Sequence, residues 1–427
     1  MRDQEPAPMD AERRLSTKEA AELLGVKPET VYAYVSRGQL SSRRVSGGRG
    51  STFDAGEVEA LARRNRRDSS GGSGSGSSGG SNPGGELSVR TCLTLIESDR
   101  YFFRGVDAVD LATRHTYEEV AEWLWTGRML PGSTFTAPVA FVSVARRAVE
   151  ALPEHASPAD LLRVATVAAA TADPLRFDLS ESAVLGTART LIPTLVAALP
   201  PAGHHRTDEG PMAHRLWTRL SVRKDPDEAS LRALDAALAL LVDHDLAAST
   251  LAVRVAASAR AHPYAAVSAG LGVIEGPLHG AASGLAHRLL QDVLEQGDAA
   301  PVIADELRAG RRVPGLGHRL YPGEDPRARA LFSLLERIPR AEPALLAARD
   351  IVETTARHAP LHANVDLALA VFTVSSGMAP TAGEAIFAVA RTAGWIAHAL
   401  EEYGERPLRM RPSGLYAGPK PPQPLPE

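Results

Sequence analysis

The chain is poor in the residues that form covalent or metal-bound cross-links. Among its 427 residues there is one cysteine, Cys92, which excludes an internal disulfide and a cysteine-based zinc site. His358 and His362 have the i,i+4 spacing of zinc ligands on a helix, but Pro360 lies between them and no His-Glu-x-x-His pattern occurs. We therefore expect no metal site, and the lone cysteine fits a reducing cytoplasm.

Long apolar runs are also missing. The mostly apolar run 233–242 is too short to span a bilayer and ends at Asp243-His244-Asp245. The first twelve residues include four acids and no apolar core, unlike a signal peptide. We expect a soluble, cytoplasmic protein that makes no membrane contact.

The sequence also lacks a large excess of one charge and has few runs of strand-forming residues. The net charge of −4 gives the whole molecule no electrostatic bias toward nucleic acid. Alanine and leucine dominate the middle and end, β-branched runs are short, and no solenoid repeat is visible. With 44% hydrophobic residues the chain can bury a large core, and we predict a mostly helical protein of two or more domains.

A Gly/Ser-rich stretch divides the chain. Residues 69–85 are almost entirely glycine and serine, a composition that cannot bury a core and behaves as a flexible coil. This division predicts a flexible tail over 1–13, a small module over 14–67, a linker over 68–86, a large module over 87–416 and a Pro-rich tail over 417–427.

The small module has helix start and stop signals in the order expected for a winged helix-turn-helix. A capping box, Ser16-Thr17-Lys18-Glu19, predicts a short helix that ends at Gly25. Pro28 opens a second helix at a first-turn position. Two predicted strands, 39–45 and 51–53, form a wing, and a third helix follows them.

Arginines in this module suit contacts with phosphate, because residues 37–67 hold eight arginines against three acids. The order of elements resembles MerR-type and excisionase-type DNA-binding modules. By that resemblance the helix 28–37 would enter the major groove and the wing would touch the backbone. The expected DNA contacts are Lys27, Thr30, Tyr32, Arg37, Arg43, Arg44 and Arg49. The alternative is a protein-interaction module with a solvated basic face.

The large module is predicted to be all-α, because segments of amphipathic helical period follow one another with Pro or Gly between them. Strand signals are scarce. The expected helices cover 117–125, 138–152, 158–172, 183–199, 231–242, 246–261, 282–295, 327–335, 343–355, 365–376 and 381–402.

Three clusters in the last third interrupt this periodicity and carry residues for acid/base chemistry. They are Gly276-Pro277-Leu278-His279-Gly280, Pro314-Gly315-Leu316-Gly317-His318 and Asn364-Val365-Asp366. A histidine can donate or accept a proton near neutral pH, and an aspartate can act as a base when it is partly desolvated. Arg327 and further arginines downstream would bind carboxylates, so the clusters suit a small polyanionic carboxylate substrate.

Order and spacing of these clusters closely resemble the citrate synthase family. The resemblance runs from Tyr101-Phe102-Phe103-Arg104-Gly105 to Arg411-Pro412-Ser413-Gly414-Leu415-Tyr416, nearly the whole large module. It includes Asp243-His244-Asp245, Gly317-His318-Arg319-Leu320-Tyr321 and Arg391-Thr392-Ala393-Gly394-Trp395. It implies an all-α homodimer with a large domain and a small domain, about 280–376, that closes over the substrates.

The resemblance also implies a reaction, the condensation of acetyl-CoA with oxaloacetate to citrate and CoA. Asp366 would remove a methyl proton, His279 would stabilise the enol, and His318 would polarise and protonate the oxaloacetate carbonyl. Acetyl-CoA would be a co-substrate, with no tightly bound cofactor.

Substrate binding is implied in the same way. Oxaloacetate would be held by His244, Arg327, Arg391 and, from the partner subunit, Arg411. The adenine of CoA would be cradled by the backbone of Val313, Pro314, Gly315, Leu316 and Gly317.

Some positions depart from the family pattern. Ala247 and Ser283 stand where the family often has asparagine, and Ala281 stands where it often has glycine. Pro322 and Gly323 stand where many members carry Lys or Arg near a CoA phosphate. None of these departures affects a proton-transfer residue, so the open question is which acyl group the protein uses.

Two other functions remain open. One is 2-methylcitrate synthase, which would use propionyl-CoA and differs by one methylene. The other is a DNA-binding transcriptional regulator whose enzyme fold senses citrate, oxaloacetate or acyl-CoA.

Overall fold

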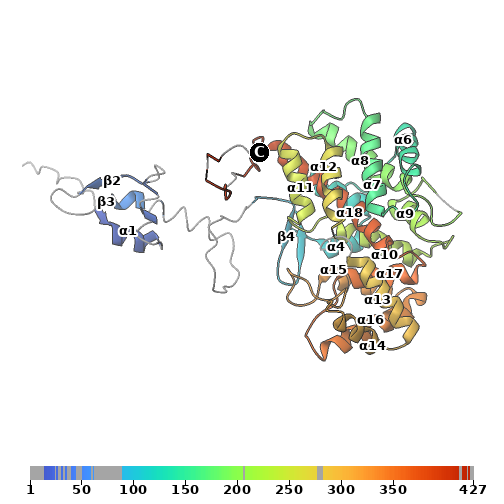
Figure 1. Cartoon of the computed structure of the whole chain (residues 1–427). Coiled ribbons are helices and arrows are strands. Elements are labelled where there is room, and N and C mark those ends of the chain that lie inside the picture. Colours follow the sequence, from blue (N-terminus) through green and yellow to red (C-terminus); the bar gives the residue numbers. More distant parts are fainter. Residues whose placement is uncertain are drawn as a thin grey trace, which may run out of the picture. The chain divides into compact units, whose positions relative to one another are not determined.

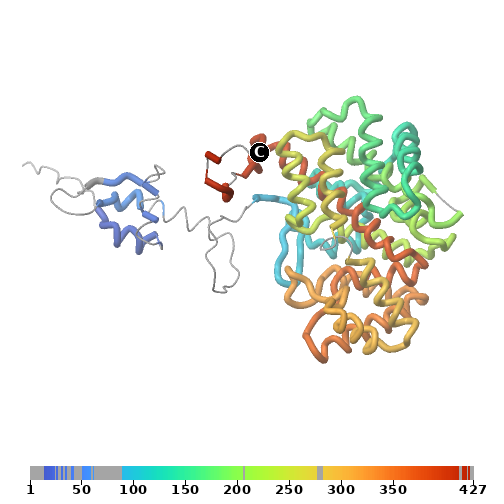
Figure 2. The backbone as a smooth tube through the Cα atoms, viewed as in Figure 1, coloured from blue at the N-terminus to red at the C-terminus, as the bar shows by residue number. Residues whose placement is uncertain are grey.

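The computed structural model divides into two compact units, Met1–Ser88 and Val89–Glu427, which we call the smaller and the larger unit (Figures 1 and 2). Each is described by itself. The structure describes residues 14–24, 26, 30–31, 34–35, 40–44, 51–58, 61, 89–204, 207–276, 282–412, 416–420 and 422–423.

The smaller unit contains a three-stranded antiparallel sheet and helix α1 (Thr17–Leu24). Strand β3 (Ser51–Asp54) lies between β1 (Arg14–Ser16) and β2 (Ser42–Arg44). The predicted capping box forms at the start of α1, where Glu19 accepts from the Ser16 amide at 2.8 Å and Ser16 Oγ accepts from the Glu19 amide at 3.3 Å. Strand β1 was not predicted, because three residues show no alternating pattern.

The core of the smaller unit surrounds Phe53, which is fully buried on β3. Ala20 of α1, Val31, Leu40 and Val58 complete this core. Apolar residues of the predicted helices and wing therefore meet in one core.

The larger unit opens with a small antiparallel sheet in which β5 (Tyr101–Phe103) lies between β4 (Thr94–Ile96) and β6 (Val106–Asp107). Arg104 and Gly105 both have positive φ, as a two-residue hairpin between β5 and β6 requires. The helices that follow are α4 (Ala108–Arg114), α5 (Tyr117–Thr126), α6 (Val139–Glu150), α7 (Pro158–Ala172), α8 (Glu181–Ala198), α9 (Met212–Leu220), α10 (Glu228–Leu241), α11 (Ala248–Ser258), α12 (Pro263–Ile274), α13 (Ala282–Gln296), α14 (Ala299–Arg308), α15 (Pro326–Leu335), the 3-10 turn η1 (Pro339–Ala341), α16 (Glu342–Ala356), α17 (Val365–Ser375) and α18 (Ala382–Gly404).

Helix α18 is the central element of the larger unit. It crosses the middle of the unit in Figure 1 and packs against α5, α7, α8, α10, α11, α12, α13 and α17. Helices α13 to α17 gather at one end of the unit, and α6, α7, α8, α11 and α12 gather at the other (Figure 1). Because α18 touches both groups, residues on it can reach whatever lies between them.

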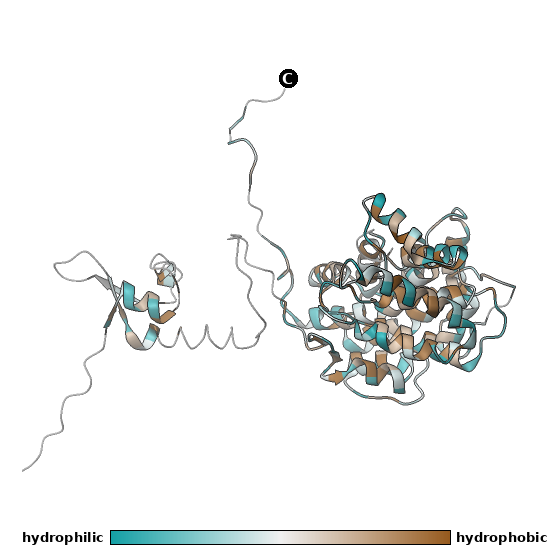
Figure 3. Ribbon diagram, turned by 90° about the horizontal axis from the view of Figure 1, so that it is seen from below, coloured by the Kyte–Doolittle hydropathy of each residue, from teal (hydrophilic) through white to brown (hydrophobic). Residues whose placement is uncertain are grey.

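Each of the eleven predicted helices is present, with ends shifted by at most three residues. The small sheet and helices α4, α9, α12 and α14 were missed. Helix α12 is apolar on almost every face, so its sequence shows no polar–apolar period. Figure 3 shows hydrophobic residues along nearly every helix of the larger unit. Within the described ranges, no helix combines the length and the apolar character needed to cross a bilayer.

Gly394 sets how closely α18 approaches the end of α10. A Cβ atom at this position would overlap the carbonyl oxygen of Val242 and lie 3.1 Å from the side chain of Asp243. We expect Gly394→Ala to lower the free energy of unfolding by about 1–3 kcal/mol, as overpacked cores do. Urea unfolding followed by tryptophan fluorescence measures this, because all four tryptophans lie in the larger unit.

Gly186→Ala in α8 is the matched control. Among the described residues, no heavy atom outside its own helical neighbourhood would lie within 4 Å of a Cβ at Gly186, so alanine gains helix propensity there without a clash. We expect this variant to be stabilised by up to about 1 kcal/mol. Equal effects of the two substitutions would contradict the close packing at Gly394.

Candidate active site

A cavity of about 920 Å³ lies where several helices of the larger unit begin. The first turns of α11, α13, α15 and α17 border it, together with the middle of α18 and the segment 317–320. Six of the residues predicted from the sequence line this cavity: His244, Gly317, His318, Arg327, Asp366 and Arg391. They come from separate parts of the chain, and the fold brings them together.

The segment 313–318 is fixed against the start of α17 by backbone pairing. Leu316 and Ala363 form a β-bridge, and the Gly317 amide donates to the His362 carbonyl at 2.7 Å. The Asn364 side chain caps α17 and donates to the Gly317 carbonyl at 2.9 Å. These contacts hold the loop that carries His318 against the start of α17, which carries Asp366, and both residues line the cavity.

Gly315 is required in this arrangement. Its φ is +81°, and a Cβ there would lie 2.8 Å from Cβ of Leu367. The glycine in the second cluster therefore serves the close approach of this loop to α17.

Asp325 forms hydrogen bonds with Arg327 and with the first turns of α15 and α17. It is 1% exposed and accepts from Nε and Nη2 of Arg327 at 2.9 and 2.7 Å, and from the amide of Val365 at 3.0 Å. It also caps α15 by accepting from the Arg327 amide. Burial opposes its ionisation, but the charge and hydrogen bonds of Arg327 hold the pKa of Asp325 below its usual value.

His318 is a neutral hydrogen-bond donor. Its Nδ1 accepts from the Leu320 amide at 3.1 Å, so the proton of the neutral ring is on Nε2. Burial, and then the nearby charge of Arg327, lowers the pKa of His318 to about 4. The ring packs against Tyr321, with centroids 4.9 Å apart.

His244 shares the neutral state of His318. Its Nε2 and the hydroxyl of Tyr321 form a hydrogen bond of 2.8 Å. Burial, followed by the charges of Arg327 and Arg391, lowers the pKa of His244 well below its usual value. The rings of His244 and His318 meet edge to face at 5.3 Å.

Asp366 has the properties of a base that works near neutral pH. Burial raises the pKa of its carboxyl to about 6, an effect that Arg327 opposes and Asp325 reinforces. Its amide donates to Oδ1 of Asn364 at 2.9 Å, which places it in the first turn of α17. The carboxylate is therefore ionised above pH 6 while both cavity histidines stay neutral.

Arg391 reaches the cavity from α18. It is 1% exposed, its Nε donates to the Leu241 carbonyl at 2.8 Å, and its guanidinium lies 4.7 Å from the centre of the Phe387 ring. Its Nη2 has no hydrogen-bond partner among the described residues. Burial lowers the pKa of Arg391 to about 10, against the opposing effect of Asp243, so the group remains a cation at neutral pH.

Other predicted residues lie elsewhere or outside the described ranges. His279 belongs to residues 277–281, which the structure does not describe. Arg411 is exposed and its amide donates to the Leu408 carbonyl. Of the five residues expected to cradle adenine, Gly317 lines the cavity and Val313 is buried, while Pro314, Gly315 and Leu316 are not among the lining residues.

Sequence reasoning did not assign roles to Tyr321, Asp325, Asp243 or Phe387, all of which contact or neighbour the predicted residues. Tyr321, Asp325 and Asp243 stand inside the motifs that drew attention to the site, so their positions beside His318, Arg327 and His244 were an available signal. Phe387 lies four residues before Arg391, a spacing that places both on one face of a helix.

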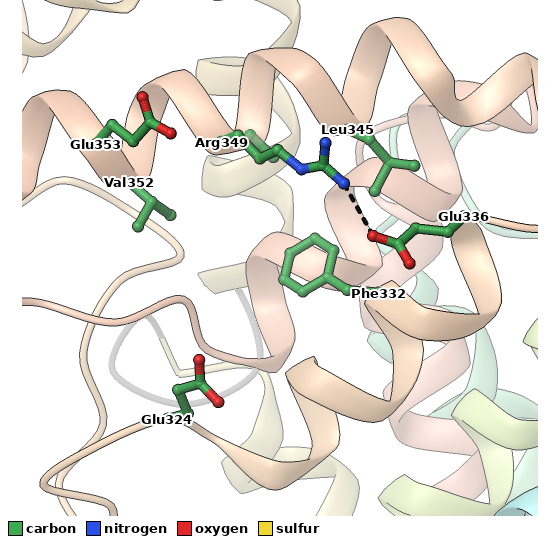
Figure 4. Close-up of a pocket in the computed structure, with 8 residues that line it drawn as sticks. Glu324, Phe332, Glu336, Leu345, Arg349, Val352 and Glu353 are labelled. Carbon is green, nitrogen blue, oxygen red and sulfur yellow. Dashed lines mark hydrogen bonds and ion pairs between the residues drawn. The ribbon is translucent and has the colours of Figure 1, made fainter.

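A second hollow, of about 290 Å³, lies between α15 and α16 (Figure 4). Phe332, Leu345 and Val352 line it together with Glu324, Glu336 and Glu353. Its one arginine, Arg349, is already paired with Glu336 at 2.8 Å. Carboxylates predominate around this hollow, so it does not suit an anionic substrate. Nowhere in the described parts of the chain do three or more potential metal ligands cluster.

The expected DNA contacts lie in the smaller unit. Thr30 is partly buried, and the backbones of Arg43 and Arg44 pair with Thr52 and Ser51 in the sheet. The expected contacts Lys27, Tyr32, Arg37 and Arg49 lie outside the described residues.

Comparison with known proteins places both units. Residues 84–413 match the family model described as citrate synthase, C-terminal domain, and residues 14–66 match the model described as helix-turn-helix domain. The chain is 37% identical over 205 residues to a putative citrate synthase 2 of Mycobacterium tuberculosis, an alignment that spans 47% of this chain and 55% of that relative. The chain thus matches little more than half the length of that relative.

Other relatives match over most of their length. A citrate synthase of Haloferax volcanii is 30% identical over 364 residues, 79% of this chain and 95% of the relative. A 2-methylcitrate synthase of Shewanella oneidensis is 26% identical over 345 residues, 76% of this chain and 90% of the relative.

Solved structures share the fold. Citrate synthase from Pyrobaculum aerophilum superposes with a TM-score of 0.66 at 24% identity, over 80% of this chain and 93% of that one. A ternary complex of carboxymethyl coenzyme A and oxaloacetate with citrate synthase from Thermoplasma acidophilum gives 0.63 at 21% identity, over 80% and 97%. With its family match over 84–413, the chain belongs to the citrate synthase family, and it carries a helix-turn-helix domain ahead of that match.

Proposed function

We propose that the larger unit is an acyltransferase that condenses acetyl-CoA with oxaloacetate to give citrate and CoA. The observation that carries this proposal is the pairing of Asp366, whose pKa is raised to about 6, with the neutral donor His318 in one cavity that also holds two buried arginines. A base, a hydrogen-bond donor and carboxylate-binding cations are what a carbon–carbon condensation onto a keto acid needs.

The reaction follows from these roles. Asp366 takes a proton from the methyl carbon of the thioester, and the electron pair moves toward the thioester oxygen as the enol forms. We assign stabilisation of that oxygen to His279, on the sequence alone. The enol carbon then attacks the keto carbon of oxaloacetate, and Nε2–H of His318 stabilises the developing alkoxide and supplies its proton. Hydrolysis of the resulting thioester releases CoA.

Oxaloacetate is held by its two carboxylates. Nη2 of Arg391 has no hydrogen-bond partner among the described residues and would receive a substrate carboxylate, while Arg327 is fixed by Asp325 and His244 by Tyr321. We place Arg411 of a partner subunit in the same site of a homodimer. The enzyme needs no tightly bound cofactor in this proposal, and the CoA adenine would lie on the backbone of 313–317. A cytoplasmic location would supply both substrates.

The first test is release of CoA from acetyl-CoA and oxaloacetate, with Asp366→Asn beside the wild type. Because the amide cannot take a proton, we expect the rate to fall by at least roughly 10²-fold. The exposed Asp292→Asn in α13 is the control for loss of a carboxylate. A wild type as inert as Asp366→Asn would support the alternative of a sensor.

The pH dependence should carry the signature of Asp366. The base works in its ionised form, so kcat/KM should fall about tenfold per pH unit below about 6. His318 stays neutral until about pH 4 and should not contribute to that limb. A pH profile that is flat between 5 and 7 would contradict the role of Asp366.

Preference for the acyl group is tested by kinetics with acetyl-CoA and propionyl-CoA. We expect acetyl-CoA to have the higher kcat/KM, by roughly tenfold or more, since one methylene is worth about 1–3 kcal/mol. The 2-methylcitrate synthase alternative is favoured by the Shewanella relative and by the small residues Ala247 and Ala282 in the cavity wall. A clear preference for propionyl-CoA would establish that alternative.

The helix-turn-helix match favours DNA binding by the smaller unit. We expect the full chain to shift duplex DNA at low salt, with affinity that falls steeply as salt rises. Replacing both Arg43 and Arg44 by alanine should weaken binding similarly for all sequences and reduce the salt slope. No shift at low salt, together with normal turnover, would reject the regulator alternative.

A further inference from the structure

A row of buried polar side chains extends from the candidate active site through the larger unit. Its members are Asp243, His398, Arg254 and Glu402, followed by Arg409 nearer the surface. His398 Nε2 lies 3.2 Å from Oδ2 of Asp243, and Nη1 of Arg254 lies 2.8 Å from Nδ1 of His398. Arg254 Nε and Arg409 Nη2 both donate to Oε2 of Glu402, at 3.3 and 2.6 Å.

The protonation of His398 follows from its partners. Arg254 can only donate, so Nδ1 of His398 is an acceptor and carries no proton. A neutral ring then has its proton on Nε2, which donates to the carboxylate of Asp243. His398 is 0% exposed, and so is Asp243. The imidazole is thus a fixed link between a buried cation and a buried anion.

Asp243 in turn faces Arg391. Burial opposes ionisation of Asp243, but His398, Arg391 and Thr94 together keep its pKa below the usual value. The same carboxylate opposes the effect of burial on Arg391. Each group also has one atom without a hydrogen-bond partner in the described structure, Oδ1 of Asp243 and Nη2 of Arg391. A Cβ at Gly394 would lie 3.1 Å from Oδ1 of Asp243, so α18 packs closely against this carboxylate.

We propose that His398 is a positioning residue for the keto acid site: it holds the Asp243 carboxylate in place opposite Arg391, and so fixes the guanidinium that receives a substrate carboxylate. This inference rests on the proposed function of the cavity. His398 is not among the residues that line the cavity, so it acts through Asp243 and not by touching substrate. Thr94 of β4 donates to the same Oδ2 and shares this role.

The arrangement predicts a selective effect on one substrate. Without the His398 donor, the Asp243 carboxylate would reorient toward Arg391 or lose its ionised state, and Arg391 would be drawn away from the substrate or left without a counter-ion. Either change weakens the hold on a dicarboxylate. We place the thioester beside Asp366 on α17, and this helix supplies no member of the row.

The test compares full-length His398→Leu, His398→Gln and wild type. For His398→Leu we expect KM for oxaloacetate to rise roughly tenfold or more, the size that loss of a hydrogen bond to a charged group produces. KM for acetyl-CoA should change less than about twofold, because the row does not reach its site. His398→Gln can donate to Asp243 and accept from Arg254, and we expect it to restore oxaloacetate KM to within roughly threefold of wild type.

A second comparison tests the route through Asp243. In an Asp243→Asn background, His398→Leu should add little further change in oxaloacetate KM, because the charge that it positions is already gone. If the two substitutions instead raise the oxaloacetate KM by independent factors that multiply, His398 does not act through Asp243. Thr94→Val removes the other donor from a different element, and keeps the proposal testable if His398→Leu fails to fold; it should raise oxaloacetate KM in the same direction.

His287→Leu is the control for loss of a buried histidine. His287 of α13 is 1% exposed and bonds Thr373 at 2.8 Å, away from the row. We expect it to lower thermal stability without a selective rise in oxaloacetate KM.

Equal oxaloacetate KM for His398→Leu and wild type, or an equal rise for both substrates, would overturn the inference. Calorimetric binding of oxaloacetate separates the two proposals, since a wild type that binds it without turnover contradicts only the reaction.

Discussion

Two buried guanidinium groups set the main constraint on the larger unit. Removing an arginine from water is costly unless an anion and hydrogen bonds compensate it, so Arg327 and Arg391 each require a buried carboxylate nearby. Asp325 meets this need for Arg327 by a two-point ion pair, and Asp243 meets it for Arg391 by its charge. Each carboxylate also anchors a second element, the start of α17 through the Val365 amide or strand β4 through Thr94. The cations therefore fix the elements that form the cavity.

The helix starts around the cavity reinforce this positive character. Helices α11, α13, α15 and α17 all begin beside it, and a helix N-terminus presents unpaired amides and a partial positive charge. An anionic substrate with two carboxylates suits such a place, and so does the carboxylate of Asp366 in the first turn of α17. The amphipathic helices thus supply both the scaffold and part of the field in which the reaction would take place.

The sequence predicted the helical class, eleven helices and six of the residues that line the cavity, because hydrophobic periodicity and the Gly and Pro residues between helices are local signals. It missed α12, whose burial on nearly all faces removes any period, and strand β1, which exists only by pairing with β3. Contacts between distant segments were also beyond it. Nothing local to His398 reveals that it bridges Asp243 and Arg254, residues more than 140 positions away, and nothing local to Asp325 reveals its bond to the Val365 amide.

The protonation states inside the cavity reverse the order found in water. A free histidine has a higher pKa than a free aspartic acid, but here the pKa of Asp366 is about 6 and that of His318 about 4. Burial disfavours charge on both groups, which raises the pKa of Asp366 and lowers that of His318. Arg327 lowers both pKa values, because it further penalises a cationic histidine and only partly offsets the cost of an ionised aspartate. Above pH 6 the aspartate is therefore an anion that can take a proton from carbon, while the histidine keeps the Nε2 proton that it must donate. Two groups with opposite tasks can work side by side at neutral pH because neither can neutralise the other by proton transfer.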